Sequence, residues 1–391
     1  MRVDAFSWLI IFIATGVSDV DDLERLGRIL AGADLSGKGP SGTYRLLGSL
    51  VLAMVRQDFA SAYELAKRFL KAKAAGDPQM LATTFLSLMV DAEGELRALL
   101  FFHAMSALSI SPRPALVEVA LAVARDEVQN CNERCMAYRA AALSMLYALS
   151  REYSVYEEAW RAFERAGRYR PIAAAWLPIE DEADLSRVEG ELSHVDKKAV
   201  KELLGISARK FMERARRRVA LNAADLYFQT HLDTGDRKYL EMALAKLERI
   251  DAETARLLRG RMLAFAGRLE EAKREFAHVK KDGILAERAK VDAAVVDALL
   301  GKPAFVASAV EDAARVANYV IAALQGEKLD YVEERYMLDV LVNAVVDISL
   351  GRRPERLRLL GDYVPAKWLI ESIISSTDKK DALRRLYFAF F

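Results

Sequence analysis

Helix-forming segments, broken at short intervals, are the feature that most constrains this chain. Ala, Leu, Glu, Arg and Lys dominate between the breaks, and these are strong helix formers. Apolar residues recur three and four positions apart, as in Leu240, Leu244 and Leu247, which is the spacing of one helix face. Alternating runs of Val, Ile and Thr, which would indicate strands, are essentially absent. The sequence therefore predicts an all-α protein.

Composition supports this class and excludes others. Of the 391 residues 53% are hydrophobic, enough for a large core, and 20 Gly with 9 Pro are few for this length. An all-β protein rich in tight turns and a disordered chain are both disfavoured. The formal net charge is only +1, so a surface built throughout to hold nucleic acid is excluded, whereas a local basic patch is not.

The breaks separate helices of about 12–20 residues, long enough to pack as antiparallel neighbours. Each helix is apolar over a wide arc, as expected when neighbours cover it on two sides. We expect a right-handed α-α superhelical solenoid of about eight antiparallel helix pairs. The expected organisation is an N-terminal helical repeat segment (1–170), an acidic, Pro-containing joint (171–196) and a C-terminal repeat segment (197–391).

Glycines mark a partly regular period. Gly235 and Gly267 lie 32 residues apart, and Gly267 and Gly301 lie 34 apart. The best unit contains Gly260 in its first helix and the run AGRLEEAKREFAHV, which includes Phe276, in its turn and second helix. In this unit the chain resembles the tetratricopeptide (TPR) family, a 34-residue helix–turn–helix repeat. The family's first-helix Trp is replaced here by Arg256, so the resemblance implies degenerate repeats.

Two further segments match the family in part. One runs from Tyr44 through Gly48 to Phe59, and the other contains Ala159 and Phe163. The resemblance implies that the first helix of each pair lines a concave groove. On such a wall Asn222, Asp225 and Gln229 would share one side at i, i+3 and i+7, with Arg261 on the next wall. These polar groups suit a peptide backbone, although an ordinary solvent-facing stripe has the same pattern.

The segment 199–219 predicts a second kind of site. Gly205 would form a turn, Ser207 would cap the following helix and Phe211 would anchor it, as in the helix-turn-helix of DNA-binding regulators. The second helix carries six basic residues: Arg209, Lys210, Arg214, Arg216, Arg217 and Arg218. Arg and Lys on an exposed helix would bind phosphates.

Two alternatives compete with nucleic-acid binding on this helix. The stretch 180–191 holds six acids against one arginine, so it could lie against the basic helix and neutralise it. Otherwise the charges could simply be solvated, or could meet a polar protein partner.

Cys131 and Cys135, the only two cysteines, cannot form a disulfide framework and indicate a reducing compartment. Four residues apart in a helical stretch, they are expected to be structural, with a metal or redox pair as the alternative. A metal site would need two more ligands, and no His lies nearby. We expect no metal and no cofactor.

Both ends of the chain are apolar. Residues 6–14 (FSWLIIFIA) predict a buried first helix, because the run is too short to span a membrane. The tail LYFAFF (386–391) is either folded back or buried in a second molecule as a homodimer contact. The segment 32–39 nearly matches a phosphate-binding P-loop, but a helical pattern precedes it where a strand is needed, so a plain connector is expected.

The sequence therefore predicts a cytoplasmic, non-catalytic scaffold or adaptor that binds a protein or peptide in a concave groove. The alternative is a nucleic-acid-binding regulator that uses 199–219. No catalytic motif such as GxSxG or HExxH occurs, although a pocket assembled from distant helices could make the chain an enzyme. Scarce amides, with five Asn and five Gln, and 29% charged residues suit a thermophile.

Overall fold

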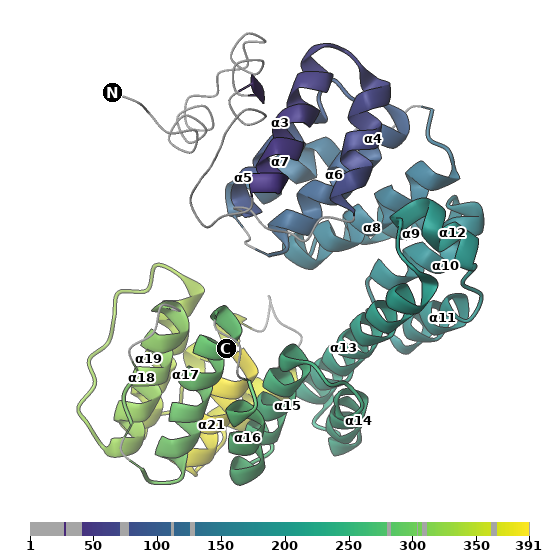
Figure 1. Cartoon of the computed structure of the whole chain (residues 1–391). Helices are drawn as coiled ribbons and strands as arrows, with labels where there is room; N and C mark the ends of the chain where they lie inside the picture. Colours follow the sequence, from purple (N-terminus) through teal and green to yellow (C-terminus); the bar gives the residue numbers. More distant parts are fainter. Residues whose placement is uncertain are drawn as a thin grey trace, which may run out of the picture. The chain divides into compact units, whose positions relative to one another are not determined.

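The computed structural model describes residues 27–28, 41–70, 78–110, 113–125, 130–279, 283–302, 304–306, 311–360 and 366–390. All elements in these ranges are helices, and no strand occurs among them (Figure 1). The prediction of an all-α protein is therefore confirmed. The chain divides into two compact units, Met1–Val219 and Ala220–Phe391. The apolar segment 6–14 and the P-loop-like segment 32–39 lie outside the described residues.

The first unit contains helices that stack on their neighbours in the chain. They are α3 (Ser41–Val55), α4 (Phe59–Phe69), α5 (Pro78–Leu88), α6 (Gly94–Leu108), α7 (Pro114–Ala124), α8 (Glu133–Ser150), α9 (Tyr153–Glu164), the 3-10 helix η1 (Gly167–Tyr169), α10 (Arg170–Ala173), the 3-10 helix η2 (Ala174–Trp176), α11 (Glu182–Leu192) and α12 (Lys197–Leu204).

Helix α8 lies at the centre of this unit, packed between α6 and α9. Its Tyr138 is almost fully buried, and the ring centre lies 5.9 Å from that of Phe102 on α6. Phe102 in turn makes an edge contact with Trp176 of η2, with the ring centres 5.7 Å apart. Each large apolar side chain buried in this way contributes roughly 1.5–3 kcal/mol, so this aromatic core holds the middle of the unit together.

The segment 171–196 does not separate the two units. Pro171 stands in the first turn of α10, and Asp181 caps α11 by accepting a hydrogen bond from the backbone of Asp184 at 2.7 Å. Leu185 and Val188 of α11 are buried. The Pro and acidic residues that suggested a joint thus start short helices inside the first unit, and the units divide after Val219.

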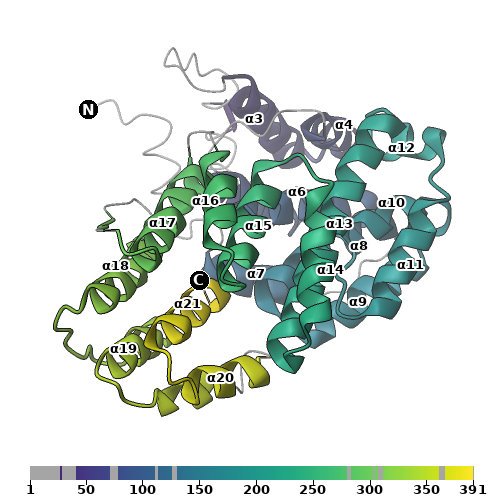
Figure 2. The same cartoon turned by 90° about the horizontal axis from the view of Figure 1, so that it is seen from below.

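Helix α13 (Ala208–Thr234) crosses that boundary, and the second unit continues along the chain. Its elements are α14 (Arg237–Glu248), α15 (Glu253–Phe265), α16 (Leu269–Ala277), α17 (Ile284–Leu299), α18 (Glu311–Gln325), α19 (Met337–Ser349), the 3-10 helix η3 (Glu355–Leu360), α20 (Lys367–Ile374) and α21 (Lys379–Phe390) (Figure 2).

The best TPR-like unit is a close helix pair, α15 and α16. Gly260 of α15 is buried, and a side chain added there would meet the ring of Phe276 on α16. A glycine at this point therefore lets the two helices approach, as the sequence predicts.

The helix-pair pattern changes after Gly301. Gly301, Gly326 and Gly351 lie 25 residues apart, and each has a positive φ at the end of a helix. Among the residues described, one helix occupies each interval, and non-helical segments at 304–306 and 327–334 take the place of a second helix. The 34-residue period does not extend into this part of the chain.

The aromatic tail is folded back onto its own unit. Leu386 and Tyr387 of α21 are fully buried, and Phe388 is 1% exposed. The Tyr387 hydroxyl donates to Oδ1 of Asp292 on α17 at 2.9 Å. Of the two alternatives for the tail, folding back is therefore the one these side chains follow, and they are not available for a homodimer contact because they are already covered within the chain.

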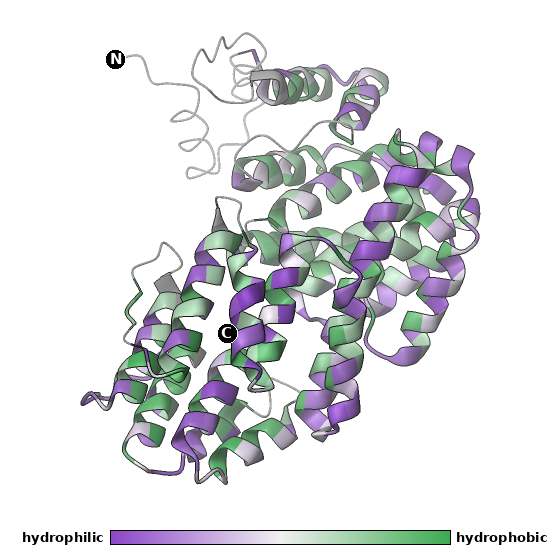
Figure 3. Ribbon diagram, turned by 60° about the horizontal axis from the view of Figure 1, so that its bottom comes forward, coloured by the Kyte–Doolittle hydropathy of each residue, from purple (hydrophilic) through white to green (hydrophobic). Residues whose placement is uncertain are grey.

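Hydrophilic and hydrophobic residues share most helices of both units (Figure 3). None of the helices that the structure describes is both long and apolar enough to cross a membrane.

Candidate nucleic-acid interface

Helices α12 and α13 form the turn that the sequence predicts at 199–219. Gly205 ends α12 with a φ of +65°, which favours glycine, and its N–H donates to the backbone oxygen of Lys201 at 3.0 Å. The Ser207 hydroxyl accepts a hydrogen bond from the backbone of Lys210 at 3.3 Å, which caps the start of α13. The reversal and the cap are both confirmed.

Core contacts fix this helix pair to the first unit. Phe211 is 2% exposed, and its ring centre lies 6.1 Å from that of Trp176. Ala215 and Val219 follow on the same side of α13 and are also buried. On α12 the backbone oxygen of Leu203 accepts a hydrogen bond from the Tyr138 hydroxyl at 2.5 Å. Contacts with the first unit therefore hold both helices that flank the turn, α12 and α13.

The opposite face of α13 is basic and exposed. Arg209, Lys210, Arg214, Arg216 and Arg217 are all exposed, and within the described part of the chain none of these five has an ion-pair partner. Successive helical residues are rotated by about 100°. By that rule Arg209, Lys210 and Arg217 share an arc of about 100°, opposite the buried Ala215.

Arg218 behaves differently from its neighbours. Its guanidinium carbon lies 5.1 Å from the centre of the Trp176 ring. Arg218 is exposed as a whole residue, but desolvation of its guanidinium group lowers its pKa to about 10, so the group stays charged at neutral pH beside the ring. Of the six predicted basic residues, Arg218 is thus the one engaged within the protein.

Helix α12 adds cations that lie outside the six basic residues predicted from the sequence. Lys197, Lys198 and Lys201 are exposed, and no ion pair involves them among the described residues. Their i, i+1, i+4 spacing on the helix before the turn was the available signal. We define the basic surface as these three lysines together with Arg209, Lys210, Arg214, Arg216 and Arg217.

The acidic stretch 180–191 makes its identified contacts elsewhere in the first unit. Oε1 of Glu180 lies 3.6 Å from Nη1 of Arg151, and Oε1 of Glu191 lies 2.5 Å from Nη2 of Arg170. Asp184 accepts a hydrogen bond from Tyr156 at 2.9 Å, and burial raises the pKa of that carboxyl. These carboxylates are used locally, so they do not neutralise the basic surface.

The predicted peptide-binding residues fall into two different settings. Asn222, Asp225 and Gln229 all lie on α13, where Asp225 is exposed and the two amides are half-buried. Arg261 is only 12% exposed, because its Nη1 pairs with Asp292 at 2.9 Å. The structure thus places Arg261 against α17, facing an internal carboxylate.

Two other asparagine side chains, which were not among the predicted residues, do hydrogen-bond a peptide backbone, and that backbone belongs to this chain itself. Asn318 of α18 accepts from the N–H of Val306 at 2.9 Å and donates to its oxygen at 2.8 Å. Asn343 of α19 does the same with Val332, at 2.8 and 2.9 Å. These two asparagines hold non-helical segments of their own chain against the helices.

The fold and the basic surface thus define an all-α protein of stacked helices with an exposed, cationic helix–turn–helix. Comparisons with protein-family models, with curated proteins and with solved structures each returned no match.

Proposed function

We propose that this protein binds the phosphate backbone of a nucleic acid through the basic surface of α12 and α13. The observation that carries the proposal is the row of five exposed cations on α13 without an ion-pair partner in the described residues. Arg and Lys in such a row neutralise phosphates and release their counterions. No catalytic role is proposed, and a cytoplasmic location fits this ligand.

The position of the cations supports the proposal, in addition to their charge. A cap and a glycine turn fix the start of α13, and Phe211 anchors it, so the basic side chains project from a rigid element. Only Glu213 opposes them on the exposed face between Arg209 and Arg217. A preorganised row loses less entropy on binding than cations on a mobile loop would.

A matched set of variants tests this proposal by fluorescence anisotropy with labelled duplex and single-stranded DNA. The triple variant Arg209→Ala, Lys210→Ala, Arg217→Ala removes the outward arc. A control with the same charge change replaces three exposed cations of the second unit that have no identified ion pair: Arg249→Ala, Lys328→Ala and Arg353→Ala.

We expect the first triple variant to weaken binding strongly and the control to bind like wild type. Equal weakening by both would show that net charge alone matters, and would contradict a site on α13. Changing Arg209 and Arg217 to Lys keeps the charge, so binding through phosphates is expected to survive it.

A protein- or peptide-binding scaffold is the second candidate. It is favoured by the polar face of α13, where Asn222, Asp225 and Gln229 stand at i, i+3 and i+7. Such a site would lose affinity on Asn222→Ala with Gln229→Ala, and would depend little on salt. Binding that is insensitive to salt and to loss of the outward arc would favour this candidate over the first.

A further inference from the structure

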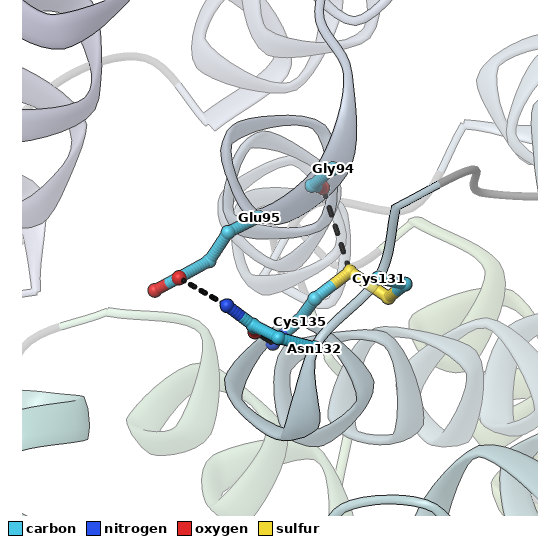
Figure 4. The surroundings of a disulfide bond; sticks show 5 residues. All are labelled: Gly94, Glu95, Cys131, Asn132 and Cys135. Atoms are coloured by element: carbon cyan, nitrogen blue, oxygen red, sulfur yellow. Dashed lines mark hydrogen bonds between the residues drawn. A yellow bond between two sulfur atoms is a disulfide. The ribbon is translucent and has the colours of Figure 1, made fainter.

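The two cysteines form a disulfide at the start of α8 (Figure 4). The sequence predicts two structural cysteines within one helical stretch, in a reducing compartment, and does not predict this bond; Cys131 in fact lies outside the helix. Asn132, between them, is the cap residue of α8, so Cys131 stands before the helix and Cys135 stands in its first turn. A residue outside the helix can turn back, and the two Cα atoms come within 5.2 Å.

The two sulfurs differ in access. Cys135 is fully buried, whereas Cys131 is half-buried. An external thiolate can therefore reach the sulfur of Cys131, with Cys135 as the leaving group. The positive end of the α8 dipole favours the thiolate that is released there.

The buried site also suits the reduced state. Sγ of Cys135 lies 3.5 Å from the backbone oxygen of Gly94, so a thiol at this position has an acceptor for its proton. After reduction, the Cys135 thiol would stay in place with its hydrogen bond to Gly94, and only the Cys131 side chain would be free to move.

The residue between the cysteines connects this turn to a polar network. The side-chain oxygen of Asn132 accepts from the backbone of Cys135 at 2.9 Å, and its nitrogen donates to Oε2 of Glu95 at 3.2 Å. Glu95 also accepts a hydrogen bond from Tyr63, and burial together with this carboxylate raises the pKa of Tyr63 well above its usual value. The disulfide thus restrains a turn that joins α4, α6 and α8.

We propose that Cys131 and Cys135 are a reversible redox pair, and that the turn at 130–135 is more ordered when the pair is oxidised than when it is reduced. In reduction, the thiolate of a dithiol attacks the sulfur of Cys131, and the electron pair of the S–S bond leaves with Cys135, which takes up a proton. The second thiol of the reductant then closes its own disulfide and releases Cys131 as a thiolate. Oxidation is the reverse exchange, with a small-molecule disulfide as the two-electron oxidant.

The first measurement is the redox equilibrium of the native, full-length chain. The protein is equilibrated with buffers of reduced and oxidised glutathione, trapped with iodoacetamide and analysed by mass spectrometry. We expect a two-electron transition between no alkylated and two alkylated cysteines. Two results would overturn the proposal: alkylation of both cysteines at every ratio, and a bond that is reduced only after unfolding in urea.

The second measurement is hydrogen exchange of the oxidised and reduced protein. In the chain-entropy picture, closing the loop 131–135 favours the ordered turn by up to about 30-fold. We therefore expect amides at 130–135 to exchange up to about 30-fold faster after reduction, with no change from residue 140 onward in α8. Identical exchange in both states would contradict the proposed coupling.

Cys131→Ser provides the matched control. This variant cannot form the bond, so it is expected to exchange like reduced wild type, with or without dithiothreitol. If the variant folds poorly, the comparison of oxidised and reduced wild type still decides the question.

Discussion

Replacing Gly260 by alanine would place a methyl group against the ring of Phe276. The new Cβ would lie 2.5 Å from Cε1 and 2.8 Å from Cδ1 of that ring, well inside van der Waals contact. Overpacking of this kind costs about 1–3 kcal/mol. Alanine is favoured over glycine in a helix by about 1 kcal/mol, so the net loss of stability is about 0–2 kcal/mol.

Gly190 provides the matched control in the same kind of element. It lies near the end of α11, and a Cβ built there meets no atom within 4 Å. Gly190→Ala therefore has the helix benefit without the clash, and should stabilise its unit by roughly 0.5–1 kcal/mol. The difference between the two variants, about 1–3 kcal/mol, isolates the close approach of α15 and α16.

The two glycines lie in different units, so the assay must read the units separately. Hydrogen exchange in increasing urea, followed by mass spectrometry, gives the unfolding free energy from peptides of α15–α16 and of α11. We expect Gly260→Ala to lower the first value and Gly190→Ala to raise the second. If Gly260→Ala stabilises its unit as much as Gly190→Ala does, the close helix pairing described here is wrong.

Three further predictions concern buried polar groups. Burial lowers the pKa of His103 to about 4 from 6.5, so the unfolded state binds the proton first. Neutral His103 therefore contributes about 3 kcal/mol to the free energy of unfolding above pH ~6.5, and this contribution is lost as the pH falls to about 4. His103→Gln should make the free energy of unfolding, measured by urea unfolding at a series of pH values, less dependent on pH over this range. Asn343→Leu leaves both backbone groups of Val332 without their partner, so the Val332 amide should exchange faster and stability should fall by about 1–3 kcal/mol; unchanged exchange and stability would contradict this. Asp292→Asn leaves Arg261 and Arg288 without the buried carboxylate that both contact, and should destabilise the second unit by about 3–5 kcal/mol in urea unfolding; a loss below about 1 kcal/mol would contradict this.

Local features of this fold could be predicted from the sequence because their signals lie within a few residues. Helix propensity and apolar spacing predict the helices, and the turn at Gly205 with its cap at Ser207 follows from single residues. The five cations of the basic surface that lie on α13 were predicted for the same reason, since they are neighbours on one helix, whereas the three lysines of α12 were missed.

Long-range pairings could not be predicted in this way. Arg261 pairs with Asp292, which lies 31 residues further along the chain, and Tyr387 donates a hydrogen bond to the same carboxylate from 95 residues away. No local pattern contains such a contact, so Arg261 was taken for a groove residue. The disulfide was missed because Cys131 was counted as part of a helix that in fact begins after Asn132.

The change of period after Gly301 has a physical explanation that the sequence shows only in retrospect. Asn318 and Asn343 each hydrogen-bond both backbone groups of one residue in a non-helical segment, so a segment without a helix can still pack there. Two asparagines in a chain with few amides were the available signal.

The measurement that tests the central claim most directly is the salt dependence of duplex DNA binding by the wild-type chain. If the five exposed cations of α13 each contact a phosphate, the slope of log K against log salt is about −4.5. Removing Arg209, Lys210 and Arg217 should reduce its magnitude by about 3. A wild-type slope near zero, or the same slope in the triple variant, would contradict a nucleic-acid interface on this helix.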